Sequence, residues 1–289
     1  MSKRKRETPV DGPRPGSHLV MMLPDLHIPH HDKEALACVV RAHELLKPRR
    51  TVILGDWLDC EAWSQHPLLS RAQERARTFF EGEVAPCRRL LAKLEENTDE
   101  IVYIEGNHEF RVERMVTQME GVMLDIADLV SPQRLLSEGR RKRFTYIPYV
   151  PAATVLPHYR IASDLIAVHG WTFARHAAAK HLEIAKHYSV VFGHVHRKQE
   201  FTARDPIEGR TYKAWSPGCL SKLQPLYMAH NPTDWVHGFS LIWVSDDREH
   251  WTEYSPMIQN GSCVLPDGRK VIASDAMSFV EEMEESEDA

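Results

Sequence analysis

Short apolar runs recur along the chain, and each is closed by glycine or polar residues. Runs of this length with such flanks are typical of buried strands. Between the first two runs, one face of a predicted helix carries Leu36, Val39, Val40, His43 and Leu46. Strands that alternate with helices predict βαβ units and a sheet covered on both faces. The five runs span residues 18–23, 51–54, 101–104, 165–168 and 189–192.

The pattern changes after His196, where strand-like pieces replace the helices. A hairpin is predicted at Pro266, Asp267 and Gly268. A second sheet packed on the first would accommodate the late strands in one domain, so we expect an α/β fold: a two-sheet β-sandwich flanked by helices, over residues 17–275. Residues 111–160 have the least regular pattern, and we expect an insertion or a cap there. The late pieces cover residues 199–204, 210–215, 238–244 and 250–257.

The two ends of the chain differ in charge from the rest. Residues 1–16 contain a basic KRKR tract with no apolar segment behind it, which is not typical of an export signal. We expect a solvated, disordered arm there, with contact to phosphate backbones as the alternative. Residues 276–289 are acidic, and we expect them to form a frayed tail.

Composition indicates an ordinary globular protein: 43% of the 289 residues are hydrophobic and 27% are charged. The net charge of −5 does not favour tight nonspecific binding to nucleic acid. Five cysteines without a CxxC pair favour reduced thiols and a cytoplasmic location. No run approaches the roughly 18 apolar residues of a membrane-spanning helix, so we expect no membrane partner. The sequence does not indicate an oligomeric state.

Polar side chains follow all five early strands within a few residues. In a parallel sheet the carboxyl ends of strands meet at one edge, where α/β folds place their ligand sites. Each group alone reads equally well as a helix cap or a satisfied core histidine. Five such groups at corresponding positions favour a cluster, and buried carboxylates need balancing cations. The residues in question are Asp25, His27, Asp56, Asp59, Asn107, His108, His169, His194 and His196.

Oxygen and imidazole groups without thiolate favour manganese, iron or zinc over softer metals. The order DxH, GDxxD, GNHE, HG and GHxH resembles the calcineurin-like metallophosphoesterase superfamily over residues 25–196. That resemblance implies a four-layer α/β/β/α fold and two divalent metal ions, with Mn²⁺ the working choice. It makes Asp56 the bridge between the ions. The implied ligands are Asp25, His27 and His196 for the first ion, and Asn107, His169 and His194 for the second.

The resemblance also gives roles to two residues that are not ligands. His108 falls where the family places a histidine that protonates the leaving oxygen or steadies the transition state, and Asp59 would orient it. Two metal ions roughly 3.5 to 4 Å apart can share a hydroxide, lower its pKa and neutralise phosphoryl oxygens during attack. His108 would supply the proton or positive charge that the leaving oxygen needs.

Departures from known branches narrow the expected function. GNHE resembles the protein Ser/Thr phosphatases, but there GDxxD is followed by Arg-Gly, whereas Asp59 is followed by Cys60 and Glu61. The GHVH motif fits phosphodiesterases and nucleases better. We therefore expect hydrolysis of phosphodiesters, of nucleic acid or nucleotides, with a phosphomonoesterase as the alternative. A noncatalytic phosphoesterase-fold scaffold that binds partner proteins is the alternative of another class. The compact layout resembles small phosphoesterases of bacteria and bacteriophages.

Candidate substrate-binding residues follow two of the motifs. Arg111 comes shortly after GNHE, and Arg175 and His176 come after His169. Guanidinium groups bind phosphate oxygens well, so these side chains are predicted to clamp a phosphoester substrate near the metal ions. The sequence specifies neither the natural substrate nor endo or exo action.

Overall fold

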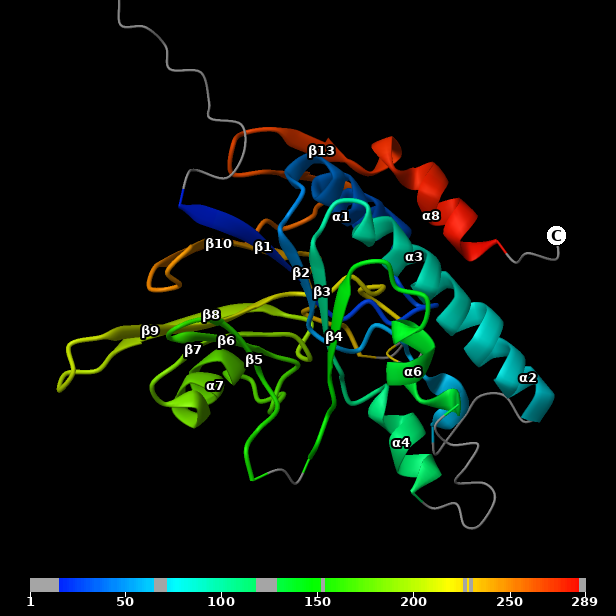
Figure 1. The fold of residues 1–289 in the computed structure, drawn as a ribbon, viewed down its shortest axis with the longest axis horizontal. Helices are drawn as coiled ribbons and strands as arrows, with labels where there is room; N and C mark the ends of the chain where they lie inside the picture. Colours follow the sequence, from blue (N-terminus) through cyan, green and yellow to red (C-terminus); the bar gives the residue numbers. More distant parts are fainter. Residues whose placement is uncertain are drawn as a thin grey trace, which may run out of the picture.

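The computed structural model describes residues 16–64, 72–117, 129–151, 154–225, 228 and 231–285. Nearly all of the predicted basic arm and the last four residues lie outside these ranges. Two large sheets face each other, and helices cover both outer faces (Figure 1). The α/β sandwich predicted from the sequence is therefore confirmed.

The first sheet has six strands in the order β11-β10-β1-β2-β3-β4. The four strands from β1 to β4 are parallel, and β10 runs antiparallel to β1. The apolar runs of the sequence become its central strands, because each has buried side chains on both faces. The strands are β1 (Ser17–Leu23), β2 (Arg50–Ile53), β3 (Glu100–Ile104), β4 (Arg143–Ile147), β10 (Ser240–Ser245) and β11 (Trp251–Tyr254).

The second sheet has five strands in the order β5-β6-β7-β9-β8. Its centre, β6-β7-β9, is parallel, and antiparallel strands flank it on both sides. A separate hairpin of β12 (Ser262–Val264) and β13 (Lys270–Ile272) encloses the turn predicted at residues 266–268. The sheet consists of β5 (Tyr159–Ala162), β6 (Leu165–Val168), β7 (Ser189–Phe192), β8 (Lys198–Arg204) and β9 (Thr211–Pro217).

Two sequence expectations about strand placement are wrong. The five early strands do not share one sheet, because β6 and β7 belong to the second sheet. The late strands β10 and β11 return to the first sheet, where β10 pairs with β1. The residues expected to form an insertion or cap include β4, which pairs in register with β3 and is part of the first sheet. Residues 118–128 of that segment lie outside the described ranges.

Helices cover the outer face of each sheet. Helix α1 begins at an Asp32 side chain that accepts the Ala35 backbone N–H, and it packs with α8 and α3 outside the first sheet (Figure 1). Helix α7 lies against the second sheet. The helices are α1 (Lys33–Leu46), α2 (Ala72–Arg77), α3 (Ala85–Glu95), α4 (Phe110–Val116), α6 (Pro132–Ser137), α7 (Ala177–Ala185) and α8 (Met277–Glu284). Short 3-10 turns span Glu61–Trp63 and Ala273–Asp275, and a π-helix spans Thr78–Val84.

The acidic end of the chain is more ordered than its composition predicts. Helix α8 covers residues that were expected to form a frayed tail, and Val280 and Met283 on this helix are fully buried. Its Glu284 contacts Lys33 and His31 at the start of α1. The charged residues form the solvent side of an amphipathic helix, so the expectation of a frayed tail is wrong for residues 277–284.

The core has three layers, set by the alternation of side chains along the strands. Met21 and Leu23 on β1 face the helices, whereas Val20 and Met22 face the second sheet. A third cluster joins β6 and β7 to α7. All five cysteines are buried and free, as expected of reduced thiols. In the described residues, no helix is long and apolar enough to cross a membrane.

Candidate metal centre

The predicted ligands gather between the two sheets, at the carboxyl ends of five strands. Asp25 and His27 follow β1, Asp56 follows β2 and Asn107 follows β3 in the first sheet. The other histidines follow β6 and β7 in the second. Candidate ligand atoms form groups whose members lie within 4.8 Å of one another. One group is Asp25, His27 and His196, and another is Asp56, His169 and His194. A third group, His27, Asp56 and His108, overlaps both.

Asp56 lies between the two groups. Its Oδ2 atom is 3.8 Å from Nε2 of His27 and 3.3 Å from Nε2 of His169. Its Oδ1 atom accepts the backbone N–H of His108 at 2.9 Å, which holds the carboxylate in place. Asn107 Oδ1 lies 3.0 Å from Nε2 of His169, on the side of the second group. Asp56 is therefore close to both groups of candidate ligands.

Two of the histidines, His169 and His27, use Nδ1 in a hydrogen bond outside the cluster, so Nε2 is the nitrogen that faces the other ligands. Nδ1 of His169 donates to the Leu54 carbonyl at 2.7 Å, and Nδ1 of His27 donates to Asp59 Oδ1 at 3.0 Å. Partners of this kind fix the tautomer of metal-binding histidines in proteins. Nε2 of His196 lies 3.1 Å from Nε2 of His27, and Nδ1 of His196 is buried without a partner among the described residues. The Nε2 atoms of these three histidines thus face the other candidate ligands.

The ligand backbone is held in an unusual conformation. Of the ten non-glycine residues with positive φ in the described ranges, five belong to the cluster. Such residues each cost about 1 to 3 kcal/mol, and they concentrate at functional sites. Backbone strain at five residues of one cluster favours a binding site over a set of helix caps. The five are Asp25, His27, Asp56, His194 and His196.

Glycines before two of the motifs allow the loops to approach one another. A Cβ on Gly106 would lie 2.1 Å from Oδ1 of Asp56, and a Cβ on Gly193 would lie 2.5 Å from Oδ2 of Asp25. Both carboxylates thus lie directly against a neighbouring backbone. The next residue, His194, donates its backbone N–H to the Asp25 carboxylate at 2.8 and 2.9 Å, which ties the two sheets together.

Burial and charge shift the acid–base properties of the cluster. Burial raises the pKa of Asp25 to about 7, although nearby His169 acts in the opposite direction. Burial lowers the pKa of His194 and of His196 to about 3. Burial alone would also lower the pKa of His169, but the Asp56 carboxylate raises it to about 9. Two buried carboxylates among mainly neutral imidazoles are a donor set that fits divalent cations.

His108 lies at the edge of the cluster and contacts the residues predicted to orient it. Its Nδ1 atom is 3.1 Å from Oδ1 of Asp59 and 3.0 Å from the Asp59 carbonyl. Burial acts to lower the pKa of His108, but Asp56 and Asp59 raise it overall. Burial opposes ionisation of Asp59, but hydrogen bonds from His108 and His27 hold the Asp59 pKa well below its ordinary value. Asp59 thus supports His108 and also a predicted metal ligand.

The predicted substrate-binding residues lie in two different places. Arg111 donates to the Asp59 carbonyl at 2.8 Å, and its other terminal nitrogen lies 3.0 Å from Nε2 of His108. Arg175 and His176 line a separate cavity of about 360 Å³ with Gln199. Arg111 is thus the predicted substrate-binding residue with a contact to His108 and Asp59.

Sequence reasoning gave no role to Glu109, the last residue of GNHE. Its side chain is fully buried and accepts the backbone N–H groups of Asp56, Trp57, Leu58 and Gly106 at 2.7 to 3.1 Å. It also accepts the Tyr103 hydroxyl at 2.6 Å. One carboxylate therefore fixes the loops that carry two predicted ligands. The signal in the sequence was a glutamate within the GNHE motif, but three of its partners lie 51 to 53 residues away in the chain.

Comparisons with known proteins give limited information. No protein-family model matches the chain, and no significant similarity to a curated protein was found. Among solved structures, a single mutant of Vps29 from Entamoeba histolytica matches with a TM-score of 0.41 and 14% identity, over 88% of this chain and 98% of that chain. Vps29 from Chaetomium thermophilum matches with a TM-score of 0.38 and 13% identity, over 88% and 94%. At these identities the likeness concerns the fold alone.

Proposed function

We propose that this protein is a metal-dependent phosphoesterase that binds two divalent ions between its sheets and cleaves phosphodiester bonds. The observation that carries the proposal is the pair of ligand groups that share Asp56. The first ion would be held by Asp25, His27, Asp56 and His196. The second would be held by Asp56, Asn107, His169 and His194. Mn²⁺ is our first choice among the ions that suit these ligands, and iron or zinc are the others.

Bound divalent ions supply an activated water and neutralise the charge on phosphoryl oxygens. The residues beside them would transfer a proton to the leaving oxygen and bind the phosphoryl group. Asp59 accepts the proton on Nδ1 of His108, so that Nε2 is the nitrogen that carries a proton to the leaving oxygen. The raised pKa of His108 favours the protonated form that this step needs. In this structure Arg111 donates to the same nitrogen. In the proposed reaction Arg111 would instead donate to a phosphoryl oxygen, which leaves Nε2 of His108 able to carry the proton.

Nucleic acid and nucleotides are the substrates we propose, with phosphomonoesters as the alternative. The test is turnover of bis(p-nitrophenyl) phosphate against p-nitrophenyl phosphate, by metal-stripped protein resupplied with Mn²⁺. Faster cleavage of the diester supports the proposal, and faster cleavage of the monoester supports the phosphatase alternative. Protein kept in chelator is the control, because any turnover there comes from a contaminant.

A noncatalytic scaffold that binds partner proteins is the remaining alternative, and the likeness to two Vps29 structures leaves it open. The two alternatives differ in what the metal-loaded protein does. A scaffold would bind two ions and cleave neither substrate. An enzyme would lose turnover on Asp56→Asn in proportion to the loss of bound metal. Absence of turnover with both ions bound would overturn the catalytic proposal for these substrates.

A further inference from the structure

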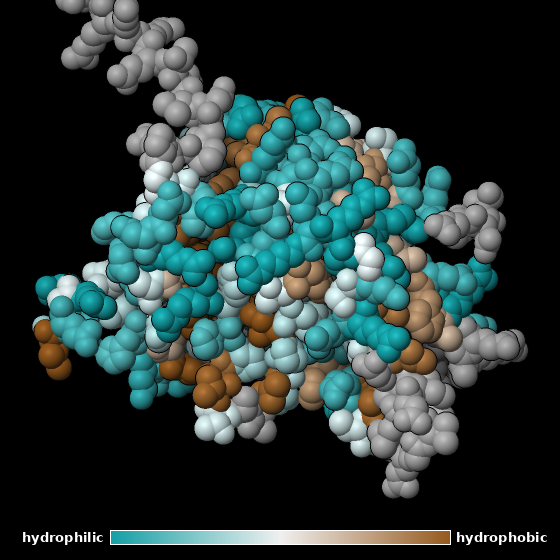
Figure 2. All heavy atoms as spheres, viewed as in Figure 1, coloured by the Kyte–Doolittle hydropathy of each residue, from teal (hydrophilic) through white to brown (hydrophobic). Residues whose placement is uncertain are grey.

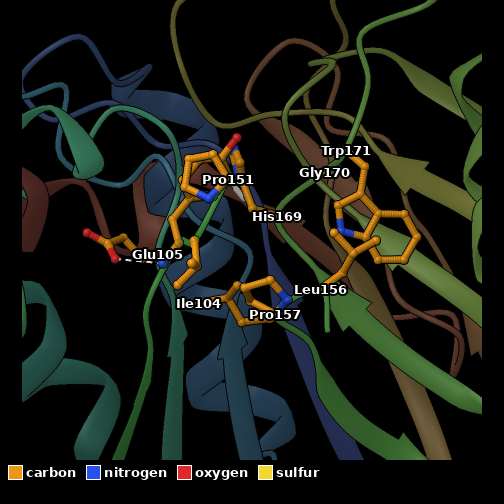
Figure 3. A pocket seen from close by; sticks show the side chains of 10 residues that line it. Ile104, Glu105, Pro151, Leu156, Pro157, His169, Gly170 and Trp171 are labelled. Atoms are coloured by element: carbon orange, nitrogen blue, oxygen red, sulfur yellow. Dashed lines mark hydrogen bonds between the residues drawn. The ribbon is translucent and has the colours of Figure 1, made fainter. Parts of the chain in front are cut away.

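A small cavity lies directly beside the metal cluster, between the ends of the two sheets (Figure 3). It has a volume of about 120 Å³, and His169 belongs both to its wall and to the cluster. The first sheet contributes Ile104 and the segment after β4, and the second contributes Trp171. A group attached to a phosphate at the cluster could therefore enter this cavity without leaving the protein surface.

Trp171 forms a rigid wall on one side of the cavity. Its ring stacks on His181 with centroids 5.5 Å apart and planes at 19°, and His181 stacks in turn on Phe192 at 3.8 Å and 10°. The His181 ring accepts the Trp171 backbone N–H at 2.9 Å, while its other nitrogen donates to the Ala177 carbonyl at 2.8 Å. Both ring nitrogens of His181 are thus used, so the tryptophan is held against a fixed support.

The opposite wall and the floor are apolar. Figure 3 shows Ile104, Pro151 and Pro157 across from the indole of Trp171, and Leu156 on the same side as the indole. The Glu105 carboxylate points away from the cavity and accepts the Tyr149 backbone N–H at 2.7 Å. The cavity is thus lined mainly by apolar side chains, with the rings of Trp171 and Tyr149 as flat aromatic surfaces.

Exposed apolar side chains continue from the cavity to the surface. Val150 is 44% exposed and Val155 is 73% exposed, and Figure 2 shows hydrophobic residues along this edge of the molecule. Phe173, which is 77% exposed, lies 5.7 Å from the ring of His194 in the cluster. Exposed apolar side chains that gather beside a cavity are typical of interaction sites. Their place beside a proposed phosphoester site points to the organic part of the substrate.

We propose that this cavity binds the base of a nucleotide whose phosphate lies at the metal cluster, with the base stacked on Trp171. The cavity volume of about 120 Å³ suits one planar ring system. Proteins commonly hold nucleobases by stacking them on aromatic side chains. The inference rests on the proposed phosphoesterase function and names its substrate class: the substrate carries a nucleobase next to the scissile phosphate.

The test compares two ligands that differ only by the base. Calorimetry measures the binding of AMP and of ribose phosphate to the Mn²⁺-loaded protein, and to Trp171→Leu and Trp171→Phe. Stacking of one base predicts that AMP binds about tenfold tighter than ribose phosphate to the original protein. Trp171→Leu should bind the two ligands equally and leave the affinity for ribose phosphate unchanged. Trp171→Phe should retain most of the preference, because it keeps an aromatic face.

Each of the other outcomes would overturn either the base site or the proposed function. Equal affinities for AMP and ribose phosphate in the original protein would overturn the base site and leave the proposed function standing. A preference for AMP that survives Trp171→Leu would place the base elsewhere and overturn it too. If hexyl phosphate binds as tightly as AMP, the cavity takes alkyl chains rather than bases. If no ligand binds to the metal-loaded protein, the proposed function and the base site are both wrong.

Discussion

At the scale of single residues, Glu109 explains how the ligand loops reach their positions. The loop with Asp56 and the loop with Asn107 come from different strands, and neither is regular secondary structure. Four backbone N–H groups from these loops point at one carboxylate, which also accepts the Tyr103 hydroxyl. Hydrogen bonds to a charged acceptor are the stronger kind, and here solvent does not compete. The geometry of the proposed metal centre therefore depends on a residue that is not a proposed ligand.

Glu109→Gln tests this dependence. The amide replaces one acceptor oxygen with an NH₂ group that faces backbone N–H groups, so buried donors lose their partner. We expect the free energy of unfolding to fall by about 1 to 3 kcal/mol. We also expect weaker Mn²⁺ binding, because the Asp56 loop is less well fixed. Urea denaturation and metal titration measure the two effects.

Glu113→Gln is the matched control, since this glutamate is exposed on the following turn of α4. A surface change of this kind should stay within about 0.5 kcal/mol. Equal effects of the two substitutions would show that Glu109 does not anchor the loops.

The sequence predicts the proposed ligands but not the residues that hold them in place. His27 and His169 stand out because each follows an apolar run, a pattern that one segment carries by itself. The support from Asp59 to His27 and from Leu54 to His169 depends on which loops meet in space. Arg175 and His176 lie close to His169 in sequence, and in the structure they line another cavity. Their predicted role in substrate binding stays a prediction.

At the scale of elements, strand positions were predictable and strand partners were not. The apolar runs at residues 165–168 and 189–192 coincide with β6 and β7. Nothing in a short run of buried residues says which sheet it joins, because both sheets are covered on both faces and select the same side chains. The register of β10 on β1 depends likewise on long-range pairing. The acidic composition around α8 predicted a solvated tail, although Val280 and Met283 at helical spacing are buried.

Helix α8 should contribute to stability. Met283 is 1% exposed and packs in the core beneath α1, so Met283→Ala removes buried surface and leaves a cavity. We expect it to lower the free energy of unfolding by about 2 to 5 kcal/mol. Met257→Ala is the control, because Met257 is 43% exposed and should matter little. Similar small losses for both variants in urea denaturation would mean that α8 is not docked in solution.

At the scale of the whole molecule, the proposed metal ions join the two sheets. The first sheet brings Asp25, His27, Asp56 and Asn107, and the second brings the other three ligands. Direct links across this junction include the bond from the His194 backbone to Asp25 and the contact of His169 with Asp56. Ions held by both sheets bind the folded state only. They should therefore stabilise the whole fold and not one loop.

Removal of metal should lower the melting temperature of the protein, and Mn²⁺ should restore it. A ligand at a hundred times its dissociation constant adds about 2.7 kcal/mol to the free energy of unfolding. Differential scanning calorimetry in chelator and in increasing Mn²⁺ measures this gain. The same titration on His194→Ala should give a smaller shift. A melting temperature independent of Mn²⁺ would argue against ions between the sheets.

The number of metal ions per chain tests the central claim most directly. Metal-stripped protein is dialysed against Mn²⁺, and elemental analysis gives the ratio of metal to protein. The account predicts two ions for the original chain and two for His108→Ala, since His108 holds none. It predicts about one for His194→Ala, which removes a ligand of the second ion and leaves the first group intact. A ratio near zero for the original chain, or equal loss in His108→Ala and His194→Ala, would contradict it.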